Sequence, residues 1–207
     1  MITSTIEIKV PEEIIKGLEE KLDGIKNPKS VVKTMLNNTA KQVQRILAQK
    51  TAREYAGEAA KKSTVMDSSE IKKATAASQI AEVRFKSPVH EIKDFHVSSL
   101  TISKTYYRKN GKRGGKHIKG NVLRGSSKLL DHAFTVRFKN GHIAVVSRIP
   151  GSKMESNPKK EKLKKLLSPS HSVMVGGKKV YGESSDSIGV IMHDEAEKII
   201  EKILGGR

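Results

Sequence analysis

Hydrophobic and polar positions alternate in two stretches of the chain, and this period of two predicts β-strands. Near the start, charged residues separate the apolar side chains of Ile6, Ile8 and Val10. In "SQIAEVRFKS", three apolar residues occupy every second position and would share one face of a strand: Ala81, Val83 and Phe85. Both stretches are typical of strands with one buried face.

The segment "FTVRFKNGHIAVVSR" predicts a β-hairpin. In its first half, apolar residues recur at every second position, namely Phe134, Val136 and Phe138. Asn140-Gly141 tolerates the positive φ angles that a two-residue hairpin turn requires, and residues 143–146 then form the returning strand. We expect Arg137 and Lys139 on the polar face of this hairpin.

Apolar residues three or four positions apart predict three longer helices. The first would begin at Pro11 and end at Gly24. The second covers residues 28–55, and its small residues Thr39 and Ala40 favour packing on the protein's own sheet over the reading of nucleic acid. The third is C-terminal and ends at Gly205, and its apolar stripe comprises Ile188, Ile191, Met192, Ala196, Ile199, Ile200 and Ile203.

Two further segments complete the expected organisation. Pro150-Gly151 begins a polar linker over about 150–160, and "NPKKEKLKKLL" predicts a short lysine-rich helix that ends at Ser168-Pro169. The elements together predict an α+β fold in a single domain, 1–207. An antiparallel sheet with a clear hairpin would be covered by N-terminal helices and a C-terminal helix, with extended basic loops.

The composition changes this picture through charge. The chain carries 40 Lys and Arg residues against 22 Asp and Glu residues, so its formal net charge is +18 at pH 7. Such an excess opposes compaction unless an anionic partner or an assembly screens it. Only 4% of residues are aromatic, which predicts a modest aliphatic core. The absence of cysteine and of any long apolar run predicts a soluble cytoplasmic chain without disulfides, thiolate metal sites or membrane spans.

Positive charge is densest in the loop of about 104–119, within "TISKTYYRKNGKRGGKHIKGNV". This stretch has no Asp or Glu, and its basic residues are Lys104, Arg108, Lys109, Lys112, Arg113, Lys116 and Lys119. It suits contact with nucleic-acid phosphates, where Tyr106 and Tyr107 would stack on single-stranded bases. It equally suits an arm that orders against an acidic protein surface, or a loop that is merely solvated. The residues alone leave these three interpretations open.

Signatures of catalysis are missing. "KNGKRGGKHIKG" lacks the spacing of a phosphate-binding loop, and the seven histidines include no pair at helical i, i+4 spacing. Paired carboxylates such as Glu12-Glu13 fall in the first predicted helix, where the helix dipole accounts for them. We therefore predict neither an enzyme nor a cofactor nor a metal site.

Several segments resemble the minor tail protein Z family of long-tailed phages, also called tail completion proteins. The resemblance begins in "NNTAKQVQRILAQKTAREY" and "IKKATAASQIAEVRFKSP". It continues in "SKLLDHAFTVRFKNGHIAVVSRI", which has an alanine-phenylalanine pair and a Gly-His turn. "EKLKKLLSPSHSVMVG" resembles the family's basic helix and Gly-Pro-Ser motif, with Ser168 where glycine is usual.

The resemblance implies a non-enzymatic virion protein of the phage tail, assembled in the host cytoplasm. It implies action at the head-proximal end of the tail tube, in tail completion and head-tail joining, near the end of the packaged DNA. Its partners would be other tail and neck proteins (tail tube, tail terminator or connector) and further copies of itself in a ring of about six. The alternative hypothesis is a free cytoplasmic nucleic-acid-binding protein, and a nuclease is a more distant third.

On either hypothesis, the seven basic residues at positions 104–119 are the first candidates for contact with DNA or an anionic partner. Arg137 and Lys139 on the hairpin are the second candidates.

Overall fold

The computed structural model describes residues 3–9, 20, 28–98, 100, 106–107, 113–114, 118–130 and 132–204. The described residues form two compact units. Unit 1 is drawn from residues 1–52, 61–88 and 170–207, and unit 2 from residues 53–60 and 89–169. The prediction of a single domain over 1–207 stays a prediction.

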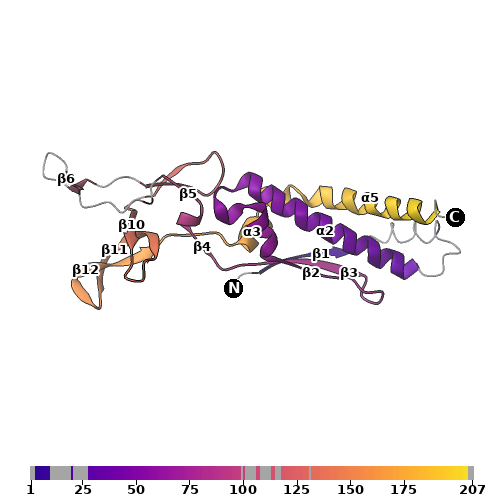
Figure 1. Ribbon diagram of the computed structural model, residues 1–207, viewed down its shortest axis with the longest axis horizontal. Coiled ribbons are helices and arrows are strands. Elements are labelled where there is room, and N and C mark those ends of the chain that lie inside the picture. The colour runs from indigo at the N-terminus through magenta and orange to yellow at the C-terminus, as the bar shows by residue number, and fades with distance from the viewer. Residues whose placement is uncertain are drawn as a thin grey trace. The chain divides into compact units, whose positions relative to one another are not determined.

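Unit 1 is built from one small sheet and helices (Figure 1). Its strands are β1 (Thr3–Lys9), β2 (Ser69–Lys72) and β3 (Ile80–Lys86). Its helices are α2 (Pro28–Glu54, of which residues 28–52 belong to unit 1), α3 (Lys62–Asp67), α4 (His171–Gly176), η3 (Lys178–Gly182) and α5 (Ser185–Leu204).

The sheet of unit 1 has the strand order β1-β3-β2, and both pairings are antiparallel. Its alternation is the one that the sequence predicts. Ile6 lies opposite Val83 and Ile8 opposite Ala81, so apolar side chains of both strands meet on one face. Phe85, Val83 and Ala81 are all fully buried.

Helix α2 contacts the sheet on one side and α5 on the other. Successive helical residues are rotated by about 100°, so residues two apart point in nearly opposite directions. Accordingly, Gln44 donates a hydrogen bond to Ser69 at the start of β2, 2.6 Å away, while Gln42 hydrogen-bonds to Glu195 of α5. Thr39, Ala40 and Ala48 are fully buried, which confirms that this helix packs within the protein. The predicted antiparallel α+β architecture is also confirmed.

Helix α4 returns to the sheet after the whole of unit 2. It contacts β1 and β3. Ser4 donates a 2.6 Å hydrogen bond to the carbonyl of Ser172, and the backbone N–H of His171 donates to the buried hydroxyl of Ser87 at 2.7 Å. Segment 89–169 of unit 2 begins after Pro88 and ends before Ser170. These bonds therefore hold the chain just before and just after this segment.

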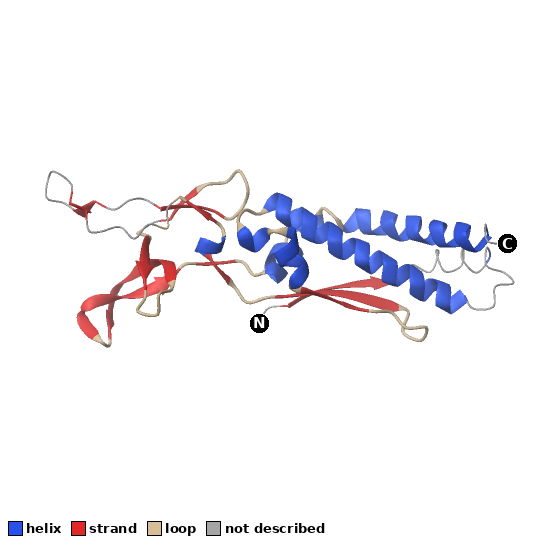
Figure 2. Cartoon of the chain, viewed as in Figure 1, coloured by secondary structure: helices blue, strands red, loops and turns tan. Residues whose placement is uncertain are grey.

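Unit 2 consists mainly of strands, with short helical turns between them (Figure 2). The turns are η1 (Glu58–Ala60) and η2 (Ile92–Asp94). The strands are β4 (His90–Glu91), β5 (His96–Val97), β6 (Tyr106–Tyr107), β7 (Arg113–Gly114), β8 (Ile118–Asn121), β9 (Lys128–Leu130), β10 (Phe134–Arg137), β11 (Ile143–Met154), β12 (Asn157–Lys165) and β13 (Leu167–Ser168).

The core of unit 2 is small and aliphatic. Ile92, Ile118, Ala133 and Val145 are buried together. Leu130 and Leu166 are among the partly buried side chains that pack against them. One three-stranded sheet, in the order β10-β11-β12, supplies Val145, and another, in the order β5-β8-β9, supplies Ile118 and Leu130.

The predicted hairpin is confirmed, but its turn differs. Strands β10 and β11 pair from Phe134↔Val146 to Arg137↔Ile143. Phe138 N–H donates to the carbonyl of His142, and Gly141 N–H donates back to the carbonyl of Phe138. Three residues, 139–141, therefore form the loop. Of the predicted turn residues Asn140 and Gly141, only Gly141 has a positive φ, 82°. The expected two-residue turn is wrong, because a single left-handed glycine closes a three-residue loop.

The predictions for residues 150–167 are wrong. The expected linker at 150–160 is the end of β11, a turn and the start of β12, and the expected lysine-rich helix is β12 itself. Pairing with β11 satisfies the backbone hydrogen-bonding groups of β12. A helix over the same residues would need to bury an apolar stripe of Leu163, Leu166 and Leu167. In the structure, Leu166 packs into the core while Leu167 is 57% exposed, so no helical face is buried.

The first predicted helix, 11–24, lies outside the described residues except for Glu20. Val10, the last position of the first predicted strand, also lies outside them. The predicted C-terminal helix is confirmed as α5, and Met192, Ala196 and Ile200 of its stripe are buried. Among the described residues, no helix is long and apolar enough to cross a lipid bilayer.

Candidate interface for nucleic acid and protein partners

Most of the basic positions of the predicted loop lie outside the described residues, namely Lys104, Arg108, Lys109, Lys112 and Lys116. Tyr106 and Tyr107 form β6, which pairs with β7, so that Tyr107 lies opposite Arg113. This short ladder brings the two tyrosines and one of the predicted arginines to the same pair of strands.

Lys119 is the one predicted residue of the loop whose side chain the structure describes. It is exposed on β8, between the buried positions Ile118 and Gly120. Ser98 holds its backbone through two hydrogen bonds, because Lys119 N–H donates to the Ser98 hydroxyl and Ser98 N–H donates to the Lys119 carbonyl, each at 2.9 Å. The ammonium group therefore extends into solvent from a fixed point of the sheet.

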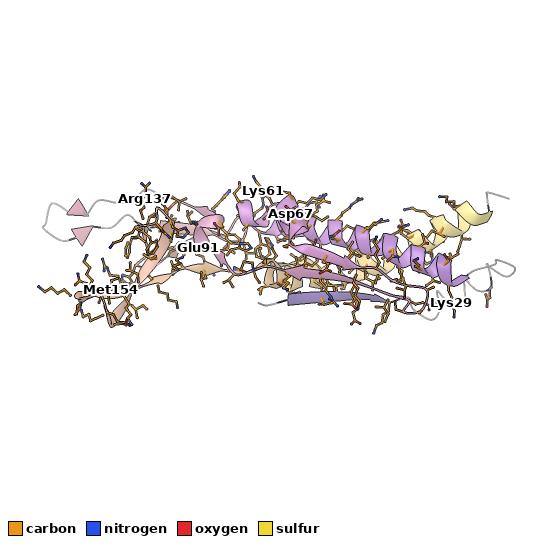
Figure 3. All side chains as sticks on the ribbon, turned by 60° about the horizontal axis from the view of Figure 1, so that its bottom comes forward. Lys29, Lys61, Asp67, Glu91, Arg137 and Met154 are labelled. Atoms are coloured by element: carbon orange, nitrogen blue, oxygen red, sulfur yellow. The ribbon has the colours of Figure 1, made fainter. Side chains whose placement is uncertain are left out.

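Arg137 and Lys139 are exposed at the end of β10 and in the following turn. The structure adds a larger set of exposed cations on the same sheet. In Figure 3, the labels of Arg137 and Met154 mark the position of this sheet. These exposed residues of β11 and β12 are Arg148, Lys153, Lys159, Lys160, Lys162, Lys164 and Lys165. Sequence reasoning missed them as a surface because it assigned the segment to a linker and a helix.

A groove lies along one face of this sheet, and we call it the β10–β12 groove. Its apolar lining comes from Phe134, Val136, Met154 and Leu163. Its charged lining consists of Arg148, Lys153, Lys159, Lys160 and one carboxylate, Glu161. The guanidinium carbon of Arg148 lies 5.1 Å from the centre of the Phe134 ring, so this cation covers part of the aromatic face.

Glu91 organises the charges behind the hairpin. Its carboxylate lies 3.0 Å from Lys165 Nζ and 3.0 Å from His142 Nε2, with Lys93 Nζ 3.8 Å away. Burial alone would raise the pKa of Glu91, but the hydrogen bonds from Lys165 and His142 and their charges outweigh it and lower the pKa. Glu91 therefore stays ionised and neutralises part of the positive charge at this end of the sheet.

The same contacts fix the side chain of His142. Lys93 Nζ lies 3.4 Å from His142 Nδ1 on one side of the ring. On the other side, Nε2 lies 3.0 Å from each carboxylate oxygen of Glu91. The ring also stacks on Phe138, with centroids 6.1 Å apart. The histidine of the Gly-His turn thus holds the hairpin to β4 and η2.

The geometry offers cationic and apolar surface for binding. In the part of the chain that the structure describes, no group of three or more His, Asp or Glu side chains is placed to hold a metal ion. A model of the family described as prophage minor tail protein Z (GPZ) matches residues 11–168. The chain belongs to this family.

The match begins after β1 and ends with β13, and it includes both the β10–β12 groove and the basic loop. A minor tail protein Z is a structural, non-enzymatic protein of the phage tail. The predicted family and the predicted absence of enzymatic activity are therefore confirmed. Neither a curated protein nor a solved structure matches the chain significantly.

Proposed function

We propose that this minor tail protein Z completes the tail at the head-proximal end of the tail tube and takes part in head-tail joining. In this position a ring of about six copies would contact other tail and neck proteins and lie close to the end of the packaged DNA. Membership of the family carries the proposal. The exposed cations of β8 and of the β10–β12 sheet support it, since a protein beside DNA benefits from positive charge.

Arg137 and Lys139, together with the basic residues of loop 104–119, are the proposed contacts to DNA or to an anionic partner. Lys119 supports this assignment because its side chain is solvent-exposed on a strand whose backbone is held. Tyr106 and Tyr107 are the proposed stacking residues if the DNA end is single-stranded. All of these side chains act by binding, so salt should weaken their effect.

The position along the tail is tested by labelling. Gold-conjugated antibodies against the protein are applied to purified virions and to isolated tails, and the particles are imaged by electron microscopy. We expect label on isolated tails at the end that joins the head. Label along the whole tube or at the distal tip contradicts the proposed position.

DNA contact is tested by a salt series. Duplex binding by the full chain is compared with that of a variant in which the seven basic residues at 104–119 are changed to Gln. Removing one bond between a basic side chain and a phosphate should flatten the log-log salt slope by about 0.9. A matched control changes seven exposed basic residues of unit 1 to Gln: Lys29, Lys33, Lys41, Arg45, Lys62, Lys73 and Lys86.

A slope that flattens in the loop variant and not in the control supports DNA contact by the loop. Equal slopes in all three proteins mean that the loop serves a protein partner or solubility. Tight, sequence-dependent binding by the isolated protein would instead favour a free nucleic-acid-binding protein.

A further inference from the structure

The outer face of α5 carries a charge opposite to that of the whole chain. The helix contains five carboxylates and only two lysines, within a chain of net charge +18. Four of these carboxylates are exposed, and they belong to Asp186, Asp194, Glu197 and Glu201. At about 100° per residue they fall within an arc of roughly 80°, opposite the buried face of Met192 and Ala196.

An exposed hydrophobic side chain interrupts this acidic stripe. Val190 lies within the same arc, and 60% of its surface is exposed. It is the most exposed large hydrophobic residue in the described part of the chain. A surface complementary to a stripe of carboxylates around an exposed valine would be both cationic and apolar.

The β10–β12 groove has this combination. Its lining includes Phe134, Val136 and Leu163 as apolar side chains and Arg148, Lys159 and Lys160 as cations. Electrostatic complementarity of this kind directs association and fixes orientation, while burial of apolar side chains adds affinity. DNA is a poorer occupant, because phosphates would leave the apolar lining uncovered and would meet the carboxylate of Glu161.

We propose that the outer face of α5 in one copy occupies the β10–β12 groove of the next copy. This inference rests on the proposed function, since it names the contact that would build the ring. The two surfaces belong to different units of the chain and differ from each other, so the contact is heterologous. A repeated heterologous contact closes into a ring when its rotation permits.

Charge reversal on each side tests the contact. The helix variant carries Asp194→Lys, Glu197→Lys and Glu201→Lys, and the groove variant carries Arg148→Glu, Lys153→Glu, Lys159→Glu and Lys160→Glu. Self-association of each full-length protein is measured by sedimentation velocity over a concentration series at low salt. A control variant carries Lys33→Glu, Lys41→Glu, Arg45→Glu and Lys62→Glu on exposed positions of unit 1.

We expect the wild type and the control to self-associate, and each reversed variant to do so at least about tenfold more weakly. An equimolar mixture of the two variants should regain association within about threefold of wild type. In the mixture, every reversed helix finds a reversed groove and every native helix finds a native groove. This rescue excludes misfolding as the cause of the weaker association of each single variant.

Three results would overturn the proposal: a wild type that stays monomeric at all concentrations, a helix variant that associates like wild type, or a mixture that fails to associate. Weakening in the groove variant alone would also overturn it, because the groove would then bind a surface of the next copy other than the outer face of α5. The position of the protein in the virion is measured independently by labelling, so failure of this contact and failure of the proposed function remain distinguishable.

Discussion

The carboxylate of Glu91 lies 3.0 Å from Nε2 of His142, although 51 positions separate the two residues. The contact joins β4 to the turn that follows β10. Lys165 of β12 reaches the same carboxylate, so one partly buried acid connects three segments of unit 2. A single carboxylate therefore contacts cationic or imidazole groups of two other segments of this unit.

Replacing Glu91 with Gln should destabilise unit 2. The substitution keeps the volume but removes the charge that Lys165 and His142 contact, and hydrogen bonds to charged groups contribute about 1.5–3 kcal/mol each. Because the side chain is 19% exposed, we expect a loss of about 1–2 kcal/mol in the free energy of unfolding in urea. Glu155→Gln is the control, since that carboxylate is 95% exposed, and it should leave stability unchanged. Equal effects of the two substitutions would contradict the role of Glu91.

The stabilisation by Glu91 should depend on pH. The folded state lowers the pKa of Glu91 below its ordinary value of 4.5, so its contribution is fully present above pH 4.5 and is lost as the pH falls through the lowered pKa. Thermal unfolding of wild type and Glu91→Gln should therefore differ most near neutral pH. The two melting temperatures should converge as the pH is lowered below 4.5. A difference that is constant down to acid pH would show that the charge of Glu91 is not what stabilises the fold.

Two glycines with similar backbone angles should respond differently to alanine. Gly57 has φ 86°, and an added Cβ would lie 2.3 Å from Phe95 Cα, whereas Gly141 has φ 82° and open space around it. Gly141→Ala should cost about 1–2 kcal/mol from the left-handed conformation alone. Gly57→Ala must also move backbone, so we expect a loss of about 3 kcal/mol or more. Similar losses in urea unfolding would mean that the approach to Phe95 is not close in solution.

Helix α2 should tolerate a larger side chain on one face only. Ala40→Leu inserts bulk at a fully buried position and should cost about 1–3 kcal/mol through overpacking. Gln49→Leu makes the same new side chain at an exposed position of the same helix and should change little. Circular dichroism during urea unfolding checks both variants. A stable Ala40→Leu protein would argue against the packing of α2 in unit 1.

The elements that the sequence predicts correctly are those in which the spacing of hydrophobic residues matches the burial seen in the structure. The alternation of β3 is buried as its spacing predicts. The stripe of α5 is buried at Met192, Ala196 and Ile200 and half-buried at Ile188, Ile191 and Ile199. Strand β12 could not be recognised in this way. Its half-buried positions Asn157, Glu161 and Leu163 lie at the even spacings of a strand, but two of the three are polar, so no hydrophobic alternation marks the segment. Its pairing with β11 is set by tertiary structure.

The candidate site was harder to predict than the fold. Basic residues are visible in the sequence, but their gathering on β11 and β12 depends on the hairpin between them. The partners of Glu91 are 51 and 74 positions away, and no local pattern joins residues so far apart. The exposed face of α5 is different, because its acidic spacing can be read directly once the helix is recognised.

The decisive measurement is electron microscopy of phage particles made without this protein. The proposed function predicts filled heads and separate tails of normal length that fail to join, with infectivity restored by wild-type protein supplied in trans. Normal, DNA-filled and fully infectious virions in its absence would contradict a role in tail completion and head-tail joining.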